Sequence, residues 1–327
     1  MLNRQRPVLR VVLLALVAAM FAFAVLGTVL GWQAYRYACA QERATAVVEG
    51  IVVEDGIGDL DDIRVRWVDQ AGGEHVQRFG IYDIDRYTKG QAFPVAYDPA
   101  DPEPRGFPAD PDETSAEDDL LVPILIAGFV AVLVVLAWAL RGILFRRAAG
   151  RSSSLMVASV LAGDRPDGPP ISVGNSTWIA IAKDRRRGPD RWQRVMWHPA
   201  VDSVSGTIPV TVHGDVSSKR RLVIELPGQV RLVPIGRLRH QPPKRVVLEE
   251  RADVRDTLDD LVILPAGALL PRARPWWWRA AVFALVGAVF GGICAVLFIG
   301  GGTTVPLAAV AGAALLVNVW AFTGAEP

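Results

Sequence analysis

Four long, uninterrupted apolar runs dominate the hydropathy pattern of this 327-residue chain. A helix needs about 20 apolar residues to cross the hydrocarbon layer of a bilayer, and none of the four runs contains Asp, Glu, Lys or Arg. As helices, these runs satisfy their own backbone hydrogen bonds in lipid. The pattern therefore predicts four transmembrane helices, over residues 11–31, 120–140, 280–299 and 304–322.

The first apolar run has an alternative interpretation as a cleaved signal peptide. Arg4, Arg6 and Arg10 precede it as a basic n-region would, and the sequence Ala38-Cys39-Ala40 resembles a cleavage site. The apolar core of a signal peptide, however, is only about 7–15 residues long, and this run is longer. Its length favours an uncleaved anchor, so we predict that residues 1–31 form an N-terminal cytoplasmic tail and the first span.

The polar stretches between the runs differ in charge, although the formal net charge of the chain is only +1. Residues 32–119 contain 8 Lys and Arg against 20 Asp and Glu, whereas residues 141–279 contain 24 against 13. Basic residues that flank spans favour the cytoplasmic side. Such residues precede the first and third spans and follow the second: Arg4, Arg6, Arg10, Arg141, Arg146, Arg147, Arg151, Arg272, Arg274 and Arg279. We therefore predict a multi-pass protein of the cell membrane with both termini in the cytoplasm.

Short alternating runs in residues 32–119 predict a small extracytoplasmic β domain followed by an acidic linker. Residues 46–53 are rich in β-branched side chains. Residues 63–68 alternate and residues 75–81 resume after a Gly-Gly pair, which is typical of a hairpin. A further turn at Lys89-Gly90 precedes a last predicted strand at residues 93–97.

Residues 141–279 predict a larger, basic, β-rich cytoplasmic domain, either a sandwich or a partly open barrel. We interpret the serines at 152–154 as a linker before this domain. Its predicted strands lie at residues 178–182, 192–197, 208–213, 222–226, 230–233 and 246–248. Residues 258–270 are too short to span a bilayer and contain Pro265, so they predict an interfacial or re-entrant segment. The predicted fold class is thus membrane α plus β.

The order of elements around the first domain carries a resemblance. A span is followed by residues 44–50, a hairpin with a Gly-rich turn, and Lys89-Gly90-Gln91; the sequence Tyr97-Asp98-Pro99, with Asp101-Pro102, then precedes another span. With this order of elements, the segment of about residues 10–140 resembles the bacterial membrane-protein family catalogued as domain of unknown function 3592. The resemblance implies an architecture, and it supplies no catalytic residues.

Three groups of residues are predicted to contact lipid or neighbouring helices. Aromatic rings at the span boundaries are expected to lie at headgroup depth: Trp32, Tyr35, Tyr37, Trp276, Trp277 and Trp278. Two basic runs beside the anionic inner leaflet favour lipid contact: Arg185, Arg186, Arg187, Lys219, Arg220 and Arg221. Small residues four apart allow close helix packing, within the bundle or in a dimer: Gly287, Gly291, Ala308 and Gly312. A solvated face or a protein partner is the alternative for the basic runs, and another envelope protein is a candidate partner of the chain.

The sequence offers no catalytic, cofactor or metal site. The four histidines are widely spaced, the acidic run at 54–62 lacks the spacing of a calcium loop, and no nucleic-acid-binding motif accompanies the basic runs. Spans without charge also argue against ion transport. The prediction is a non-enzymatic interaction or sensing scaffold of the bacterial cell envelope. The alternative is a membrane enzyme that acts on lipid or envelope precursors near Trp276–Trp278.

Overall fold

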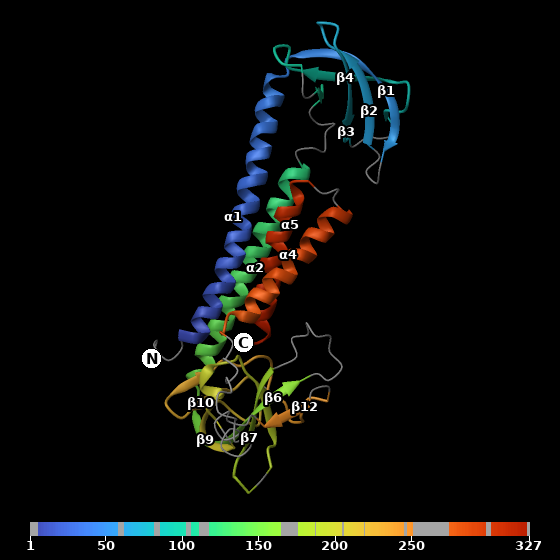
Figure 1. Cartoon of the computed structure of the whole chain (residues 1–327). Coiled ribbons are helices and arrows are strands. Elements are labelled where there is room, and N and C mark those ends of the chain that lie inside the picture. The colour runs from blue at the N-terminus through green and yellow to red at the C-terminus, as the bar shows by residue number, and fades with distance from the viewer. Residues whose placement is uncertain are drawn as a thin grey trace, which may run out of the picture. The chain divides into compact units, whose positions relative to one another are not determined.

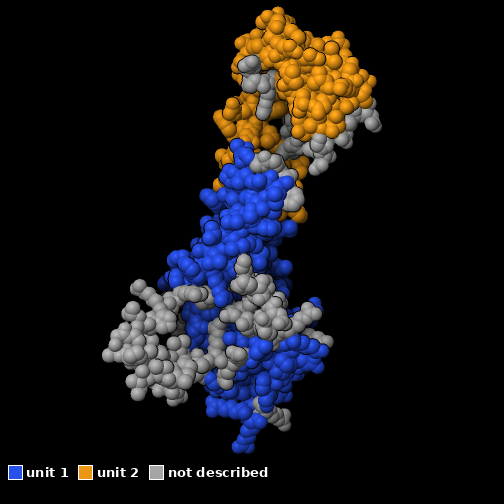
Figure 2. Space-filling view, turned by 45° about the vertical axis from the view of Figure 1, so that its right-hand side comes forward, with its two compact units in different colours: residues 1–22, 131–327 blue, residues 23–130 orange. Residues whose placement is uncertain are grey.

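The described part of the computed structural model contains four long helices and two antiparallel sheets (Figure 1). The structure describes residues 6–57, 62–81, 86–102, 106–110, 118–164, 176–186, 188–204, 206–218, 220–244, 247–250, 275–298 and 302–325. The predicted interfacial segment at 258–270 lies outside these ranges, as do Arg187 and Lys219. The chain divides into two compact units, one of residues 23–130 and one of residues 1–22 with 131–327 (Figure 2).

Within the described ranges, four helices are long and apolar enough to cross a membrane, as predicted. They are α1 (Arg6–Arg43), α2 (Asp118–Ala149), α4 (Trp278–Phe298) and α5 (Thr304–Thr323). Helices α1 and α2 continue beyond the apolar runs because residues 32–43 and 141–149 contain no proline to interrupt the backbone ladder.

Helices α4 and α5 form a tightly packed antiparallel pair through small residues. A Cβ atom added at Gly287 would lie closer than 3.0 Å to the backbone of Gly312, and one added at Gly291 would overlap the carbonyl oxygen of Ala308. The four small residues named from the sequence therefore lie in the contact between these two helices. Polar contact joins α5 to α1, because Asn318 Nδ2 donates a hydrogen bond to the Ala15 carbonyl oxygen (3.0 Å).

The unit of residues 23–130 contains a five-stranded antiparallel sheet in the order β3-β2-β1-β4-β5. Its strands are β1 (Ala46–Ile57), β2 (Asp62–Val68), β3 (Glu74–Phe79), β4 (Ala92–Tyr97) and β5 (Gly106–Pro108). Alternation along β2 places Ile63, Val65 and Trp67 in the core. Tyr97 completes this core and accepts a hydrogen bond from the Gln70 backbone amide (2.9 Å).

The other unit contains a seven-stranded antiparallel sheet in the order β11-β10-β9-β6-β7-β8, with β12 paired to β6. Its strands are β6 (Ser153–Asp164), β7 (Ser176–Ala182), β8 (Arg191–Arg194), β9 (Thr207–His213), β10 (Val223–Leu226), β11 (Val230–Leu232) and β12 (Val247–Glu250), with a short 3-10 helix at Pro199–Val201. The chain after β11 returns to β8, where Met196 N donates to Val233 O (2.8 Å) and Trp192 N to Arg239 O (2.9 Å). The sheet thus curls on itself.

The interpretation of residues 152–154 as a linker is wrong. Ser153 and Ser154 begin β6 and pair with His213 and Val212 of β9. Both serines are exposed, so their hydroxyl groups remain available to solvent while the backbone enters the ladder. Strand β6 is central because β7 and β9 pair with its two edges.

Candidate functional site

A cavity of about 660 Å³ lies between the N-terminal end of α1, the C-terminal part of α2 and the β10–β11 hairpin. Its volume lies within the range of about 300–1,000 Å³ that is typical of small-molecule sites. The lining residues are Val8, Leu9, Val12, Trp138, Arg141, Gly142, Phe145, Arg146, Met196, Glu225, Gln229, Arg231 and Val233. Helical and sheet residues therefore form this site together.

The apolar wall of the cavity continues into a core that joins the helix ends to the second sheet. Val8 from α1, Trp138 from α2 and Trp320 from α5 are buried in one cluster with Met196 and Val233, which follow strands β8 and β11. Residues from four helices and from the β domain share this cluster. Burial of Met196 and Val233, which leave water on packing, favours the contact of the domain with the helix ends by about 1.5–3 kcal/mol for each side chain.

Trp138 and Arg141 form the polar centre of the cavity. They are three residues apart in α2 and so share one helix face. The Trp138 ring stacks on Phe322 of α5, with ring centroids 4.4 Å apart and an interplanar angle of 17°. Arg141 Cζ lies 5.4 Å from the centroid of the Trp138 ring, and Arg141 Nη2 donates a hydrogen bond to the Phe322 carbonyl oxygen (3.3 Å).

Two buried donors at this centre have no hydrogen-bond partner among the described residues: Arg141 Nη1 and Trp138 Nε1. Trp138 is only 6% exposed, so solvent does not reach its ring freely. Leaving a buried donor unsatisfied costs about 1–3 kcal/mol, and more for a charged group. A bound acceptor with negative charge would remove both penalties.

Positive charge exceeds negative charge around Arg141. The guanidinium groups of Arg194 and Arg221 lie within electrostatic range of it. Among the described residues that line the cavity, Glu225 is the one acid. Arg231 Nε donates to its Oε2 (2.7 Å), and His213 Nε2 lies 3.0 Å from the same oxygen. The Glu225 carboxylate is therefore already engaged by these two partners.

The hydrogen bond from Arg231 is the main reason that the pKa of Glu225 is lowered from its ordinary value, and the contact with His213 acts in the same direction. Partial burial opposes this shift because it disfavours the charged carboxylate. Glu225 is consequently ionised at neutral pH and paired with Arg231. Its charge does not neutralise Arg141, which forms no ion pair with a described residue.

The predicted interface aromatics have different surroundings. Trp32 and Tyr35 are each 61% exposed on α1, so the protein itself does not cover their rings. Tyr37 instead is buried in the contact with Phe107, with ring centroids 5.2 Å apart. It thus differs from the expected anchor, because packing against the sheet of its own unit covers the ring.

The Trp triplet also divides between two environments. Trp277 and Trp278 are exposed, whereas Trp276 packs against the core of the curled sheet and against the cluster at the helix ends. Trp276 therefore departs from the prediction of a lipid anchor: its ring contributes to the join between sheet and helices.

The predicted basic runs are only partly brought together. Arg185 and Arg186 are exposed in the turn after β7, and Arg220 is exposed before β10. Arg221 is half-buried and close enough to Arg141 for their charges to interact. Among the described members of the basic runs, Arg221 is thus the one whose charge interacts with Arg141 at the centre of the cavity.

The main site residues, Trp138 and Arg141, are not among the site residues predicted from the sequence. Arg141 entered the prediction only as a marker of membrane orientation. The available signal was the spacing of an indole and a guanidinium by three residues at the end of an apolar run, which places both on one helix face. The contribution of Glu225 and Arg231 had no local signal, since β10 and β11 reach the cavity only through tertiary packing.

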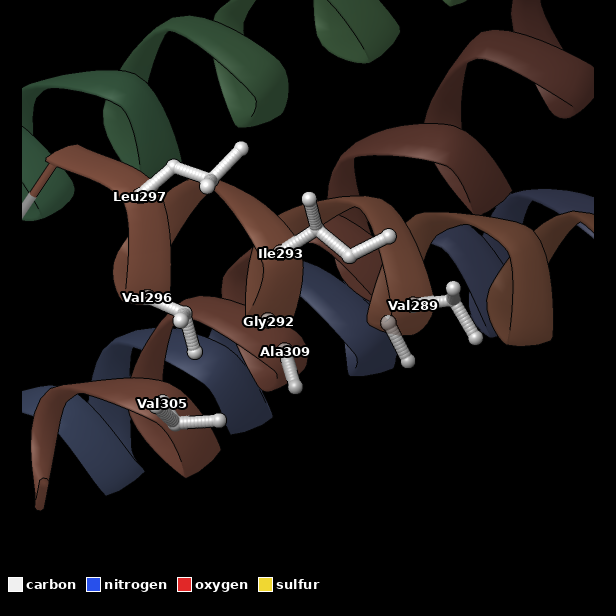
Figure 3. Close-up of a pocket in the computed structure, with 8 residues that line it drawn as sticks. Val289, Gly292, Ile293, Val296, Leu297, Val305 and Ala309 are labelled. Carbon is white, nitrogen blue, oxygen red and sulfur yellow. The ribbon is translucent and has the colours of Figure 1, made fainter. Parts of the chain in front are cut away.

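A second hollow is a shallow apolar groove along α4 and α5, where Gly292, Ile293 and Val305 lie (Figure 3). Its lining contains no charged or polar side chain, which is suited to contact with acyl chains and offers no chemistry. Within the described ranges, no cluster of three His, Cys, Asp or Glu residues is placed to hold a metal ion.

No protein-family model, curated protein or solved structure matches the chain. The functional interpretation therefore depends on the geometry and charge of the residues themselves.

Proposed function

We propose that the chain is a multi-pass membrane protein of the bacterial cell envelope that acts as a non-enzymatic binding and interaction scaffold. The observation that carries the proposal is the shared core and cavity between the helix ends and the curled sheet. Trp197 N donates to Gly324 O (2.9 Å), and Arg194 Nη2 donates to Thr323 O (2.6 Å). A ligand bound at this junction would contact the membrane helices and the β domain at once.

The proposal places both termini and the curled sheet in the cytoplasm, because basic residues gather around the corresponding helix ends. Its test uses a variant without Cys39 and Cys294 that carries either Glu74→Cys or Arg185→Cys, since both positions are exposed. A membrane-impermeant maleimide should label residue 74 in intact cells and residue 185 only after permeabilisation. The reverse pattern would show that the orientation is inverted.

The acidic domain of residues 44–107 would be the external interaction module of this scaffold. The resemblance to domain of unknown function 3592 supports this arrangement of a β domain between two spans. We expect native purification of the full-length protein, followed by mass spectrometry, to yield a specific protein partner. Deletion of residues 44–107 should abolish its recovery. The Arg185→Gln/Arg186→Gln variant, which is altered in the other domain, should retain it.

Two outcomes would contradict the scaffold proposal. Recovery of the same proteins with and without residues 44–107 would show that the external domain has no partner of its own. Recovery of no protein at all, with tight retention of one lipid or envelope precursor, would shift the interpretation towards the enzyme.

The enzyme is a second candidate because of one observation, the buried His213 in contact with Glu225, which lines the cavity. A histidine held by a carboxylate can transfer protons in catalysis. The described lining residues, however, contain no Ser, Thr or Cys to serve as a nucleophile. Conversion of the co-purified lipid by the purified protein, with loss of conversion in His213→Gln, would establish this alternative.

A further inference from the structure

We propose that the cavity binds an anionic amphiphile, with Arg141 Nη1 and Trp138 Nε1 donating hydrogen bonds to its phosphate or carboxylate oxygens and the wall from α1 contacting its apolar chain. The inference rests on the proposed binding role, and it names the class of ligand. In a bacterial membrane the corresponding ligand chemistry is that of an anionic phospholipid of the inner leaflet.

The two unsatisfied hydrogen-bond donors are the reason to expect an anionic ligand. Arg141 is held in place on one side by the Phe322 carbonyl and by the Trp138 and Phe322 rings. Its second terminal nitrogen, Nη1, is buried without a partner in the described structure. A guanidinium matches the oxygens of phosphate and carboxylate, and hydrogen bonds to a charged acceptor are stronger than neutral ones.

The carboxylate of Glu225 does not supply the missing hydrogen-bond acceptor for Arg141 Nη1 and Trp138 Nε1. Its carboxylate is engaged by Arg231 at 2.7 Å and by His213 at 3.0 Å. The field of Arg194 and Arg221 acts on Arg141 from the same unit. An uncharged headgroup would leave this positive charge uncompensated, whereas an anionic group would offset it.

The apolar part of the ligand follows from the apolar residues that line the cavity. Val8, Leu9 and Val12 line the cavity from α1, and Phe145 lines it from α2. Leu9 is 48% exposed on a helix that is long and apolar enough to span a membrane. The cavity therefore joins a polar centre at a helix end to a surface suited to acyl chains. A free anion would bind at the polar centre and would leave the apolar wall of the cavity exposed to water.

The test is native mass spectrometry of the full-length protein in an uncharged detergent. Dioctanoyl phosphatidylglycerol, dioctanoylglycerol and inorganic phosphate are titrated separately. We expect saturable binding of the phosphatidylglycerol, with much weaker binding of the other two. Comparison with dioctanoylglycerol measures how much the phosphate group contributes to binding. Comparison with inorganic phosphate measures how much the acyl chains contribute.

Variants connect the binding to the two donors. Arg141→Gln should weaken phosphatidylglycerol binding about tenfold to a hundredfold, because it removes a charged donor. Trp138→Phe keeps an aromatic ring against Phe322 but lacks the N–H, and it should weaken binding by about two- to tenfold. The control variant Arg66→Gln removes an exposed charge on β2, outside the cavity and outside the basic runs, and should bind as the unaltered protein does.

Several outcomes would overturn the inference. Equal affinity of the unaltered protein, Arg141→Gln and Trp138→Phe would remove these residues from the site. Equal binding of dioctanoylglycerol would show that the cavity does not select an anion, and equal binding of inorganic phosphate would show a site for a free anion. If Arg141→Gln fails to fold, as judged by gel filtration and its melting temperature, Trp138→Phe decides.

Failure of the inference is distinguishable from failure of the proposed function. A protein partner that depends on residues 44–107, together with lipid binding unchanged by Arg141→Gln, would keep the scaffold and reject the amphiphile site. Loss of lipid binding in Arg141→Gln without any protein partner would keep the site and reject the interaction scaffold.

Discussion

Replacing Gly291 with alanine is expected to disrupt the packing of α4 against α5 and to destabilise the protein by about 3 kcal/mol, the upper end of the usual cost of overpacking. The added Cβ would overlap the carbonyl oxygen of Ala308, and the Ala308 carbonyl carbon would lie only 2.8 Å away. Both groups belong to backbone, so no side-chain rotation relieves the overlap. The helices must move apart, and their dispersion contacts weaken.

The measurement is the melting temperature of the full-length protein in detergent, followed by intrinsic tryptophan fluorescence. Gly292→Ala is the matched control, because its Cβ would meet Val305 Cγ1 at 3.7 Å, an ordinary van der Waals distance. Gly291→Ala should melt at a clearly lower temperature than Gly292→Ala. Equal melting temperatures for the two variants would contradict the close packing of α4 and α5.

Replacing Trp67 with alanine is expected to destabilise the sheet of residues 44–107 by about 3–5 kcal/mol, the usual cost of removing a large buried aromatic side chain. Trp67 is 2% exposed. Its ring stacks on His75 at a centroid distance of 4.3 Å and contacts Tyr97 at 5.1 Å. Alanine fills little of this space and leaves a cavity between β2 and its neighbours.

Hydrogen-exchange mass spectrometry of the full-length protein measures this effect locally. Backbone amides of β2 and β3 should exchange more than a hundredfold faster in Trp67→Ala, because the free energy of opening the sheet falls by about 3 kcal/mol or more. Val76→Ala provides the control: Val76 is 58% exposed on the adjacent strand, and its change should cost less than about 1 kcal/mol. Unchanged exchange in Trp67→Ala would falsify the assignment of Trp67 to the core.

Local patterns predicted most of the secondary structure. The strands expected at residues 63–68 and 93–97 correspond to β2 and β4 within one residue. Period-two alternation and turn residues are short-range signals, so they survive in any tertiary context. Strand β6 is the main miss, because its serines resemble a linker and its identity as a strand depends on pairing with β7 and β9.

The side chains whose surroundings in the structure differ from the prediction of a membrane anchor are amphipathic aromatic residues. Tyr37 and Trp276 are of the residue types that anchor membrane interfaces, and they lie beside predicted spans, yet both pack within the protein. Trp32 and Tyr35 are exposed. An aromatic ring gains free energy by leaving water in either setting. Sequence position alone does not distinguish a lipid headgroup from a neighbouring sheet.

The sequence by itself determined four helices apolar enough to span a membrane, two β-rich segments and the spacing of Gly287 and Gly291 on one helix face. These features follow from the hydrophobic effect and from helix geometry, which act between residues close in the chain. Only the tertiary structure brought Arg141 and Trp138 beside Glu225 and Arg231 to form the cavity. More than eighty residues separate these pairs, and their meeting depends on how the curled sheet packs against the helix ends, which no local pattern encodes.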